Sequence, residues 1–387
     1  MRYIATCKLG LESVVAGELR RLSIEVEKVE DARVLFLGGP IEMARACLWL
    51  RSAERVLQEV ASFEARTFDE LFEGVKAQSW KAYLQKDSFI HVNGKSAKST
   101  LFSVSDCQSI AKKAIVENLK AAYHTTVLPE SGKRVVIEVG ILRDVVTLAL
   151  DPCGAGLSRR GYRTYNVAAP LSESLGAGIL LLSRFHGDQP LLDPMCGSGT
   201  FPIEAAMIAQ NRAPGLGRAF AAEEWNFLPP DTFTKAREEA QDSATSRPLA
   251  ILGSDIDGRS IDLCKKHAKK AGVMLQWAVR DFHDYQKDPS LLSFANGQAG
   301  LLVCNPSPYT AACVPCRTLC PAGDKASSPR TGILKRSMAS GRTTGENCPT
   351  AACPAPFISF FANNLFTNPP ASAIITMFRK NKERVGH

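Results

Sequence analysis

The spacing of apolar residues predicts a small α+β unit at the start of the chain. Arg2–Thr6 and Arg33–Leu37 have strand-like patterns, and Val56–Phe63 follows as a third strand. Two helical patterns lie between them, one in Ile41–Ser52 and one carried by Leu11, Val14, Val15, Leu19 and Leu22. The order β-α-β-α-β predicts a ferredoxin-like N-terminal domain over residues 1–64.

The next stretch, residues 65–155, predicts a second α+β domain of the same style. Phe68–Ala77 is helical, Ser88–Val92 is strand-like, and a long amphipathic helix begins after Ser105 or Asp106 as its cap. The paired strands Arg134–Gly140 and Val145–Leu150 close the domain. Residues 156–166 have the composition of a linker. They contain glycine, arginine and tyrosine, and their apolar residues do not repeat with the spacing of a helix or a strand.

Beyond Val167 short apolar strands alternate with helical patterns. The strands are expected at Leu191-Leu192, Leu249–Gly253 and Gly300–Cys304, and one helix at Thr200–Gln210. A further helix, Arg259–Ala271, has Asp257 as its cap and Gly272 at its end. This alternation predicts an α/β domain with a mostly parallel, doubly wound sheet over residues 167–305.

Composition narrows the class of protein. The chain has 387 residues, of which 45% are hydrophobic and 22% charged, typical of two or three globular domains. The longest apolar or glycine run, Leu175–Leu182, is far short of the ~18 residues of a membrane-spanning helix. No secretory signal pattern opens the sequence, and the twelve cysteines favour reduced thiols. We therefore expect a cytoplasmic protein that does not act at a membrane.

The net charge of +8 is unevenly spread. Residues 305–387 carry 10 Lys/Arg against 3 Asp/Glu, net +7, so the remainder is nearly neutral. Residues 61–166 carry 15 against 11, and this local excess of +4 includes bases in glycine-rich or tyrosine-rich settings. A phosphate-contacting surface for RNA is one interpretation and a solvated polar face is the other. The candidate RNA-binding residues are Lys95 and Lys98 in a predicted loop, and Arg159, Arg160 and Arg163 in the linker.

The strongest chemical signal is a strand, the loop Asp193–Thr200 and a helix. Gly197 and Gly199 let the backbone approach a ligand closely before the helix opens at Thr200. The loop has neither the third glycine of a dinucleotide fingerprint nor the lysine of a phosphate loop. The acid Asp193, at the carboxyl end of the strand, instead suits a cationic or amino-bearing ligand.

Two later strands also end in acids. Asp255 is placed to take ribose hydroxyls, whereas Asp257 is better interpreted as a helix cap. Asp281 with Phe282 follows the strand-like Gln276–Arg280 and is placed to meet the edge and face of an adenine; a simple strand-end turn is the alternative.

The last strand ends in Asn305-Pro306-Ser307-Pro308-Tyr309, close to the Asn-Pro-Pro-Tyr motif of enzymes that methylate exocyclic amines. In that motif the Asn side-chain oxygen and the first Pro carbonyl accept hydrogen bonds from the amine. The aromatic ring stacks on a base turned out of its helix. Ser307 is one residue too many, and we expect it to move Tyr309 away from the base.

With these motifs in place, the chain resembles the bacterial THUMP-domain class I S-adenosylmethionine-dependent RNA methyltransferases. Within them it is similar to the group that methylates the N2 amine of guanine in large-subunit ribosomal RNA. The resemblance runs from residue 1 to about 305 and is carried by the segments ESVVAGELRRL, FDELFEGVKAQSW, VNGKSAKSTLFSVSDCQSIAKKAIV, GAGLSRRGYR, APLSESLGAGILLLS and LLDPMCGSGTFPIEAAMIAQNRAPGL.

The resemblance implies a ferredoxin-like domain, a THUMP RNA-binding domain and a Rossmann-like methyltransferase domain. Asp193, Gly197, Gly199 and Thr200 would then surround the methionine part of S-adenosylmethionine, Asp255 its ribose and Asp281 its adenine. Asn305 and Pro306 would orient the guanine amine, with Tyr309 stacking on the base. No metal is implied.

After Pro306 the resemblance stops. Residues 306–387 are rich in Pro, Cys, Ser, Thr and Arg, and only Phe357–Phe361 and Ala373–Phe378 are patterned like core segments. An altered reading frame produces such a shift, and a divergent native tail is the alternative. The tail cysteines do not match a standard pair of zinc knuckles: Cys313, Cys316, Cys320, Cys348 and Cys353.

Two other functions remain open from sequence. The intact N-terminal domains could bind RNA while the altered motif leaves the chain without catalysis. The second is an amine-directed DNA adenine methyltransferase, because such enzymes share the Asn-Pro-Pro-Tyr motif.

Overall fold

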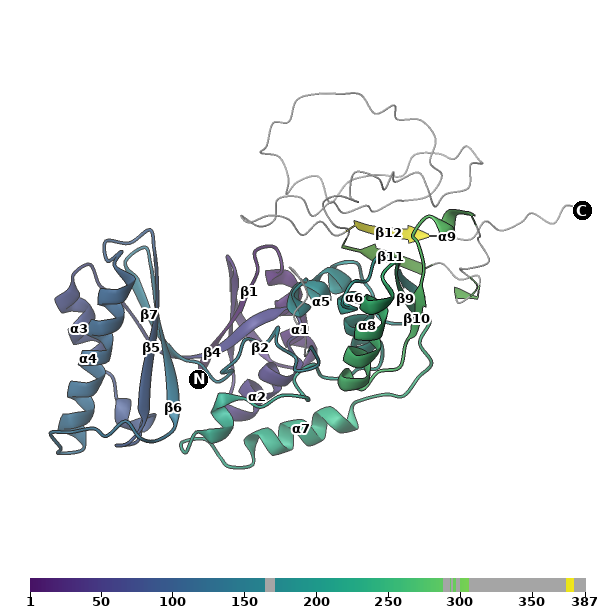
Figure 1. The fold of residues 1–387 in the computed structure, drawn as a ribbon. Coiled ribbons are helices and arrows are strands. Elements are labelled where there is room, and N and C mark those ends of the chain that lie inside the picture. The colour runs from purple at the N-terminus through teal and green to yellow at the C-terminus, as the bar shows by residue number, and fades with distance from the viewer. Residues whose placement is uncertain (164–170, 288–292, 294, 297–299, 306–373, 379–387) are drawn as a thin grey trace, which may run out of the picture.

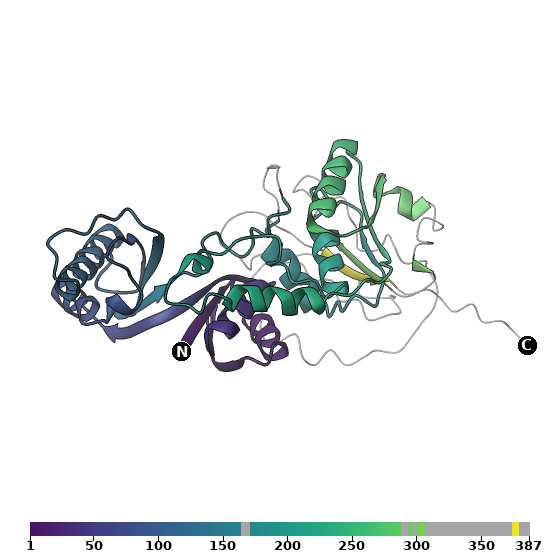
Figure 2. The ribbon, with the colours of Figure 1, turned by 90° about the horizontal axis from the view of Figure 1, so that it is seen from below.

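The computed structural model describes residues 1–163, 171–287, 293, 295–296, 300–305 and 374–378, which form two sheets. A seven-stranded sheet has the order β2-β3-β1-β4-β7-β6-β5, and a five-stranded sheet has the order β10-β9-β8-β11-β12. Figure 1 shows three parts in a row: the β5–β7 end of the first sheet, its β1–β3 end, and the second sheet. The same row is seen from below in Figure 2.

The first part has the expected ferredoxin-like character with one strand more than the sequence predicts. Its elements are β1 (Arg2–Cys7), α1 (Glu12–Arg21), β2 (Glu25–Glu30), β3 (Arg33–Leu37), α2 (Pro40–Trp49) and β4 (Ala53–Glu64). The additional strand, β2, pairs antiparallel with β3 at the edge of the sheet.

The second part carries the long predicted helix and the paired strands. Its elements are α3 (Phe68–Lys76), the short 3₁₀ helix η1 (Trp80–Ala82), β5 (Phe89–Ala97), α4 (Val104–Ala122), β6 (Arg134–Leu142) and β7 (Val145–Leu150). The predicted strand at Ser88–Val92 is too short, because β5 continues alongside β6 in parallel register to Ala97. Lys95 therefore lies in a strand and not in the predicted loop, whereas Lys98 follows the strand with a positive φ of 51°.

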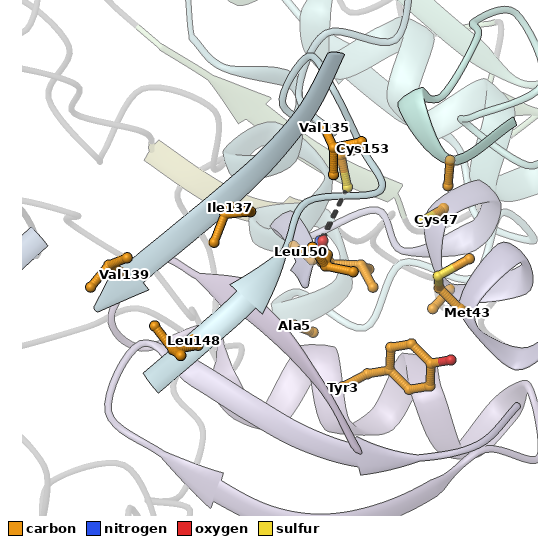
Figure 3. Close-up of a cluster of buried hydrophobic side chains, with 14 of the residues drawn as sticks. Tyr3, Ala5, Met43, Cys47, Val135, Ile137, Val139, Leu148, Leu150 and Cys153 are labelled. Atoms are coloured by element: carbon orange, nitrogen blue, oxygen red, sulfur yellow. Dashed lines mark hydrogen bonds between the residues drawn. The ribbon is translucent and has the colours of Figure 1, made fainter. Parts of the chain in front are cut away.

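Strand β4 joins these two parts into one body. It pairs with β1 along its first half and with β7 along its second half, so the sheet is continuous. Figure 3 shows the shared core, in which Tyr3 and Met43 lie in the same buried cluster as Ile137 and Leu148. The first 151 residues thus form a single packed unit, although the sequence pattern divides at residue 64.

The third part is the predicted α/β domain. Its elements are α5 (Glu173–Leu182), β8 (Leu191–Asp193), α6 (Thr200–Ala209), the 3₁₀ helix η2 (Ala221–Glu224), α7 (Thr232–Asp242), β9 (Ile251–Asp255), α8 (Gly258–Ala271), β10 (Gln276–Val279), α9 (Asp284–Lys287), β11 (Gly300–Cys304) and β12 (Ile374–Phe378). Strands β8 to β11 are parallel, and β12 runs antiparallel to β11. The predicted end signals of α8 are confirmed, since the Asp257 carboxylate accepts from the Arg259 N–H at 3.0 Å and Gly272 has φ 72°.

The segment between α6 and β9 returns to the first part of the molecule. Phe220, Trp225 and Phe233 belong to the same buried cluster as the first sheet. Helix α7 lies beside α2 (Figure 1). Arg45 of α2 donates to Glu239 of α7 at 2.7 Å. The α/β domain and the first sheet are therefore joined by direct packing of this segment as well as by the linker. No helix in the described part of the chain is long and apolar enough to cross a membrane.

Candidate functional site

The carboxyl ends of four parallel strands place the predicted polar residues at one edge of the second sheet. Asp193 and Asp255 are the last residues of β8 and β9, and Asp281 and Asn305 follow β10 and β11 closely. These strands are consecutive in the sheet order β10-β9-β8-β11, and Figure 1 shows them together in the second sheet. Open α/β sheets bind their ligands at this edge, just beyond the strand ends.

The glycine loop between β8 and α6 is held against β9 by its backbone. The N–H of Cys196 donates to the Ser254 carbonyl at 2.9 Å, and the N–H of Gly197 donates to the Asp255 carboxylate at 2.9 Å. A side chain at Gly197 would meet no described atom within 4 Å, so the loop faces open space there. At Gly199 (φ 83°) any side chain would be strained, and a Cβ atom would lie 3.0 Å from Cys264 and from Trp277, so both neighbours would have to shift.

Asp193 is a buried acid with one hydrogen bond to the backbone. The residue is only 1% exposed, and its Oδ1 accepts from the Met195 N–H at 3.2 Å. Burial raises the pKa of Asp193 well above its usual range, and the nearby charge of Asp255 raises it further. A cationic ligand at this position would favour the ionised carboxylate, because opposite charge offsets the cost of burial.

Asp255 is more accessible and already organises the loop. One carboxylate oxygen accepts from the Gly197 N–H and the other from the Asp257 N–H at 3.0 Å. A carboxylate has about four acceptor positions, so two remain for the hydroxyls of a ribose. The geometry therefore suits the ribose role expected for Asp255.

The third acid, Asp281, has a neighbour that the sequence pattern does not single out. Its Oδ1 accepts from the His283 N–H at 2.9 Å and lies 2.8 Å from His283 Nδ1. The Asp281 side chain is 44% exposed, so it remains reachable for a ligand. Phe282 is only 8% exposed, which limits the ring face that it is expected to offer to an adenine.

Asn305 ends the row of strand-end residues. Its side-chain oxygen Oδ1 is buried and has no hydrogen-bond partner among the residues that the structure describes. A buried amide oxygen without a partner is costly, and a ligand N–H removes that cost. The other residues of the motif lie outside the described residues, namely Pro306, Ser307, Pro308 and Tyr309, as do the five tail cysteines.

Three of the five candidate RNA-binding residues are exposed. Lys95 and Arg159 line one recess of about 540 Å³ between β4, β5 and the linker, together with Glu54 and Arg55. Lys98 lies three residues beyond Lys95 and is also exposed. Arg55, which the sequence pattern does not single out, pairs with Asp151 and donates to the Gly154 carbonyl at 3.0 Å.

The other two candidates are not on this surface. Arg160 is 3% exposed and forms a buried ion pair with Glu204 of α6, with Nε to Oε1 at 3.4 Å. Arg163 is largely buried and donates to Thr200 Oγ1 at 2.7 Å. These contacts correct the prediction that the two side chains contact RNA, since Arg160 donates to Glu204 and to backbone carbonyls inside the protein, and Arg163 donates to Thr200 and to the Leu171 carbonyl. The lone charge of Glu204 in the apolar helix TFPIEAAMIA is the available signal for a buried partner.

Family models match three consecutive parts of the chain. Residues 2–57 match the RlmL ferredoxin-like domain, residues 65–151 the THUMP domain, and residues 160–314 the RMKL-like methyltransferase domain. The last match ends nine residues after Asn305, near the point where the sequence pattern changes.

Two relatives match most of the chain. "Putative RNA methyltransferase YpsC" of Bacillus subtilis (strain 168) is 42% identical over 311 residues, which are 79% of this chain and 78% of YpsC. "Ribosomal RNA large subunit methyltransferase K/L" of Marinomonas sp. (strain MWYL1) is 32% identical over 320 residues. That match covers 79% of this chain but only 43% of the Marinomonas protein, so the chain spans less than half of the K/L type.

Two solved structures share the fold. One, "a predicted N6-adenine-specific DNA methylase" from Listeria monocytogenes str. 4b F2365, has 40% identity and a TM-score of 0.73 over 78% of this chain and 88% of that chain. The other, SMU.472, was solved in complex with SAH and has 31% identity and a TM-score of 0.73 over 98% of both chains.

Proposed function

The chain belongs to the family of RlmK/L-like methyltransferases that carry a THUMP domain, and from this premise we propose that it methylates RNA. The methyl donor would be S-adenosylmethionine, and the acceptor the exocyclic N2 amine of a guanine in large-subunit ribosomal RNA. The names of YpsC and the K/L enzymes support an RNA acceptor. We place the reaction in the cytoplasm, where ribosomal RNA is modified in bacteria.

The strand-end residues fit this methyl donor. The Asp193 carboxylate is buried and forms no ion pair within the described part of the chain, which suits the ammonium of the methionine part. No described atom lies within 4 Å of a side-chain position at Gly197, which leaves room for that part, and Asp255 and Asp281 would accept from the ribose and the adenine. When bound, S-adenosylmethionine supplies a methyl group on a positively charged sulfur.

The single observation that carries the proposal is the buried Oδ1 of Asn305 at the end of β11, which has no partner among the described residues. An exocyclic amine can donate one N–H to this oxygen, and the hydrogen bond then turns the nitrogen lone pair in a fixed direction. Positioning of this kind supplies a large part of the rate enhancement when the reacting atoms are held ~3–3.5 Å apart. Neither a metal nor a strong base is needed for this role of Asn305.

We further propose that the chain as written transfers methyl groups poorly. Ser307 adds one residue between Asn305 and Tyr309 relative to the Asn-Pro-Pro-Tyr spacing. One extended residue is ~3.3–3.6 Å, which is enough to carry an aromatic ring off a base. Sequence leaves two alternatives open, RNA binding without catalysis and methylation of adenine in DNA. One assay gives a different result for each of them.

The assay is methyl transfer from labelled S-adenosylmethionine, followed by nucleoside analysis, with large-subunit ribosomal RNA and with duplex DNA. Three proteins are compared: the chain as written, a repaired chain whose residues 306–387 are replaced by the matching segment of YpsC, and the repaired chain with Asn305→Ala. We expect N2-methylguanosine in RNA from the repaired chain, and a loss of about 10²–10³-fold on Asn305→Ala. The chain as written should give little product.

Each other result decides against part of the proposal. Methyladenine in DNA supports the DNA methyltransferase instead. RNA binding by the chain as written with no detectable product supports the non-catalytic alternative. Strong guanine methylation by the chain as written contradicts the argument from Ser307.

A further inference from the structure

Helix α6 begins where the glycine loop ends. Three arginines that lie outside the second sheet and its helices contact it. Nine of its ten residues are buried, and among them Glu204 is the one charged side chain. Arg163 and Arg160 come from the linker, and Arg51 follows α2 in the first part of the molecule. They contact the first turn, the middle and the last turn of the helix.

At the first turn, Arg163 binds the residue that opens α6. Its guanidinium donates to Thr200 Oγ1 at 2.7 Å and to the Leu171 carbonyl at 3.1 Å. The Nε atom lies 3.6 Å from the carboxylate of Glu173, which is 6% exposed. Thr200 directly follows Gly199, so this contact fixes the end of the glycine loop.

In the middle, Arg160 connects α6 to the first sheet. Its guanidinium pairs with Glu204, whose Oε1 also accepts from the Tyr162 hydroxyl at 3.2 Å. Another guanidinium nitrogen donates to the backbone carbonyl of Arg51. The linker is itself tied to β4, because the Leu157 N–H donates to the Glu54 carbonyl at 2.8 Å.

At the last turn, Arg51 caps the helix. Its guanidinium donates to the carbonyls of Arg212 at 2.9 Å and Met207 at 3.4 Å. The backbone at Arg51 is held by Glu18 of α1, which accepts from the N–H groups of Arg51 and of the next residue, Ser52. A cation at this end also interacts favourably with the helix dipole.

We propose that Arg163 is a positioning residue for the methyl donor, acting through Thr200. We call Arg51, Arg160 and Arg163 together the arginine clamp, because they fix helix α6 against the first sheet and its helices. Arg163 is the member of the clamp that contacts the glycine loop. The inference rests on the proposed function, since it assumes that the glycine loop holds the donor. It changes the role expected from sequence, because Arg163, expected at the RNA surface, instead supports the cofactor loop, while Arg160 holds the middle of α6.

The physical argument is one of preorganisation. A loop already fixed in its binding geometry loses less conformational entropy on binding than a loop that must be ordered first. Without Arg163, Thr200 keeps a weak 3.5 Å bond from Oγ1 to the Leu171 carbonyl. The loop should then open more often, and the donor should bind less tightly even where the fold is intact.

The test uses the full chain with S-adenosylhomocysteine as the ligand in titration calorimetry. Arg163→Met alone would leave Glu173 buried without its partner, so the main variant is Arg163→Met with Glu173→Gln. Arg163→Lys keeps the charge with fewer donors, and Arg20→Met removes an exposed arginine of α1 as the matched control. We expect Kd to rise about 10-fold in the double variant, the scale of one charge-assisted hydrogen bond, with a smaller rise for Arg163→Lys and none for Arg20→Met.

A second readout does not need the ligand. Amide hydrogen exchange should become faster at Met195–Thr200 in the double variant, while exchange in β1 and β4 stays as in the parent chain. Parent-like exchange in the loop together with parent-like Kd overturns the inference. Faster exchange throughout α5 and α6 assigns Arg163 a structural role and also overturns it. Failure of the parent chain to bind S-adenosylhomocysteine, by contrast, contradicts the proposed function, and the exchange measurement then tests loop positioning separately.

Discussion

At the scale of single residues, burial separates bases that look alike in sequence. Lys95, Lys98 and Arg159 are exposed, whereas Arg160 and Arg163 are turned inward onto α5 and α6. The local sequence RRGYR contains no sign of this difference. The difference in burial depends on distant partners. Arg163 pairs with Glu173, 10 residues further along the chain, and Arg160 pairs with Glu204, 44 residues further along. Only the tertiary contacts identify which arginines are available to RNA.

The exposed bases predict the salt dependence of RNA binding. Replacing Lys95, Lys98 and Arg159 together by Gln should lower affinity and flatten the plot of log K against log salt by up to about 2, since each lost phosphate contact changes the slope by ~0.7. Fluorescence anisotropy with a ribosomal RNA fragment measures this slope. A triple variant of exposed bases elsewhere, Arg20, Arg21 and Lys28, is the matched control. The same slope in both triple variants would place the RNA surface elsewhere.

At the scale of elements, the end signals of α8 are confirmed, but the predicted cap of α4 is wrong, because α4 begins at Val104 and both Ser105 and Asp106 lie inside it. Asp257 and Gly272 bracket α8 as their residue types suggest, and Val145–Leu150 matches β7 without change. The sequence pattern does not predict strand β2, because its register shifts between Val26 and Lys28, which breaks the alternation of apolar and polar residues. Its many charges suit an edge strand, because they discourage pairing with other chains.

The glycine loop leads to an element-scale prediction in which two Gly→Ala changes have opposite effects. Gly199→Ala should lower the free energy of unfolding by about 1–3 kcal/mol, because φ is 83° and the new Cβ meets Cys264 and Trp277 at 3.0 Å. Gly17→Ala, inside helix α1 with no described atom within 4 Å, should raise it by about 0.5–1 kcal/mol. Urea unfolding measures both. Equal effects of the two changes would show that the loop geometry around Gly199 is wrong.

At the scale of the whole molecule, the order of the three parts is predictable from sequence, but the way they combine is not. The pairing of β4 with both β1 and β7 joins residues almost 100 positions apart, and no local pattern encodes it. The packing of α7 against α2 cannot be predicted from the sequence for the same reason. In the tail, Ile374–Phe378 of the segment predicted as core-like form strand β12, which pairs with β11 on the side away from β8.

The central claim is that the carboxyl edge of the second sheet binds S-adenosylmethionine with Asp193 as its anionic contact. In the free protein burial raises the pKa of Asp193, and a bound ammonium requires the ionised form. At a pH near or below the raised pKa of Asp193, binding must therefore release a proton. The affinity for the ligand should then fall as the pH is lowered through this pKa. Asp193→Asn keeps the shape of the side chain but can neither ionise nor titrate.

The most direct measurement is calorimetric titration of S-adenosylhomocysteine into the parent chain and Asp193→Asn between about pH 5 and pH 8. The expected result for the parent chain is a Kd that rises as the pH falls. The expected result for Asp193→Asn is a Kd at least about 10-fold higher at pH 8, with less dependence on pH, the scale of one lost charge-assisted contact. An Asp193→Asn chain that binds as tightly as the parent at pH 8 would contradict the account.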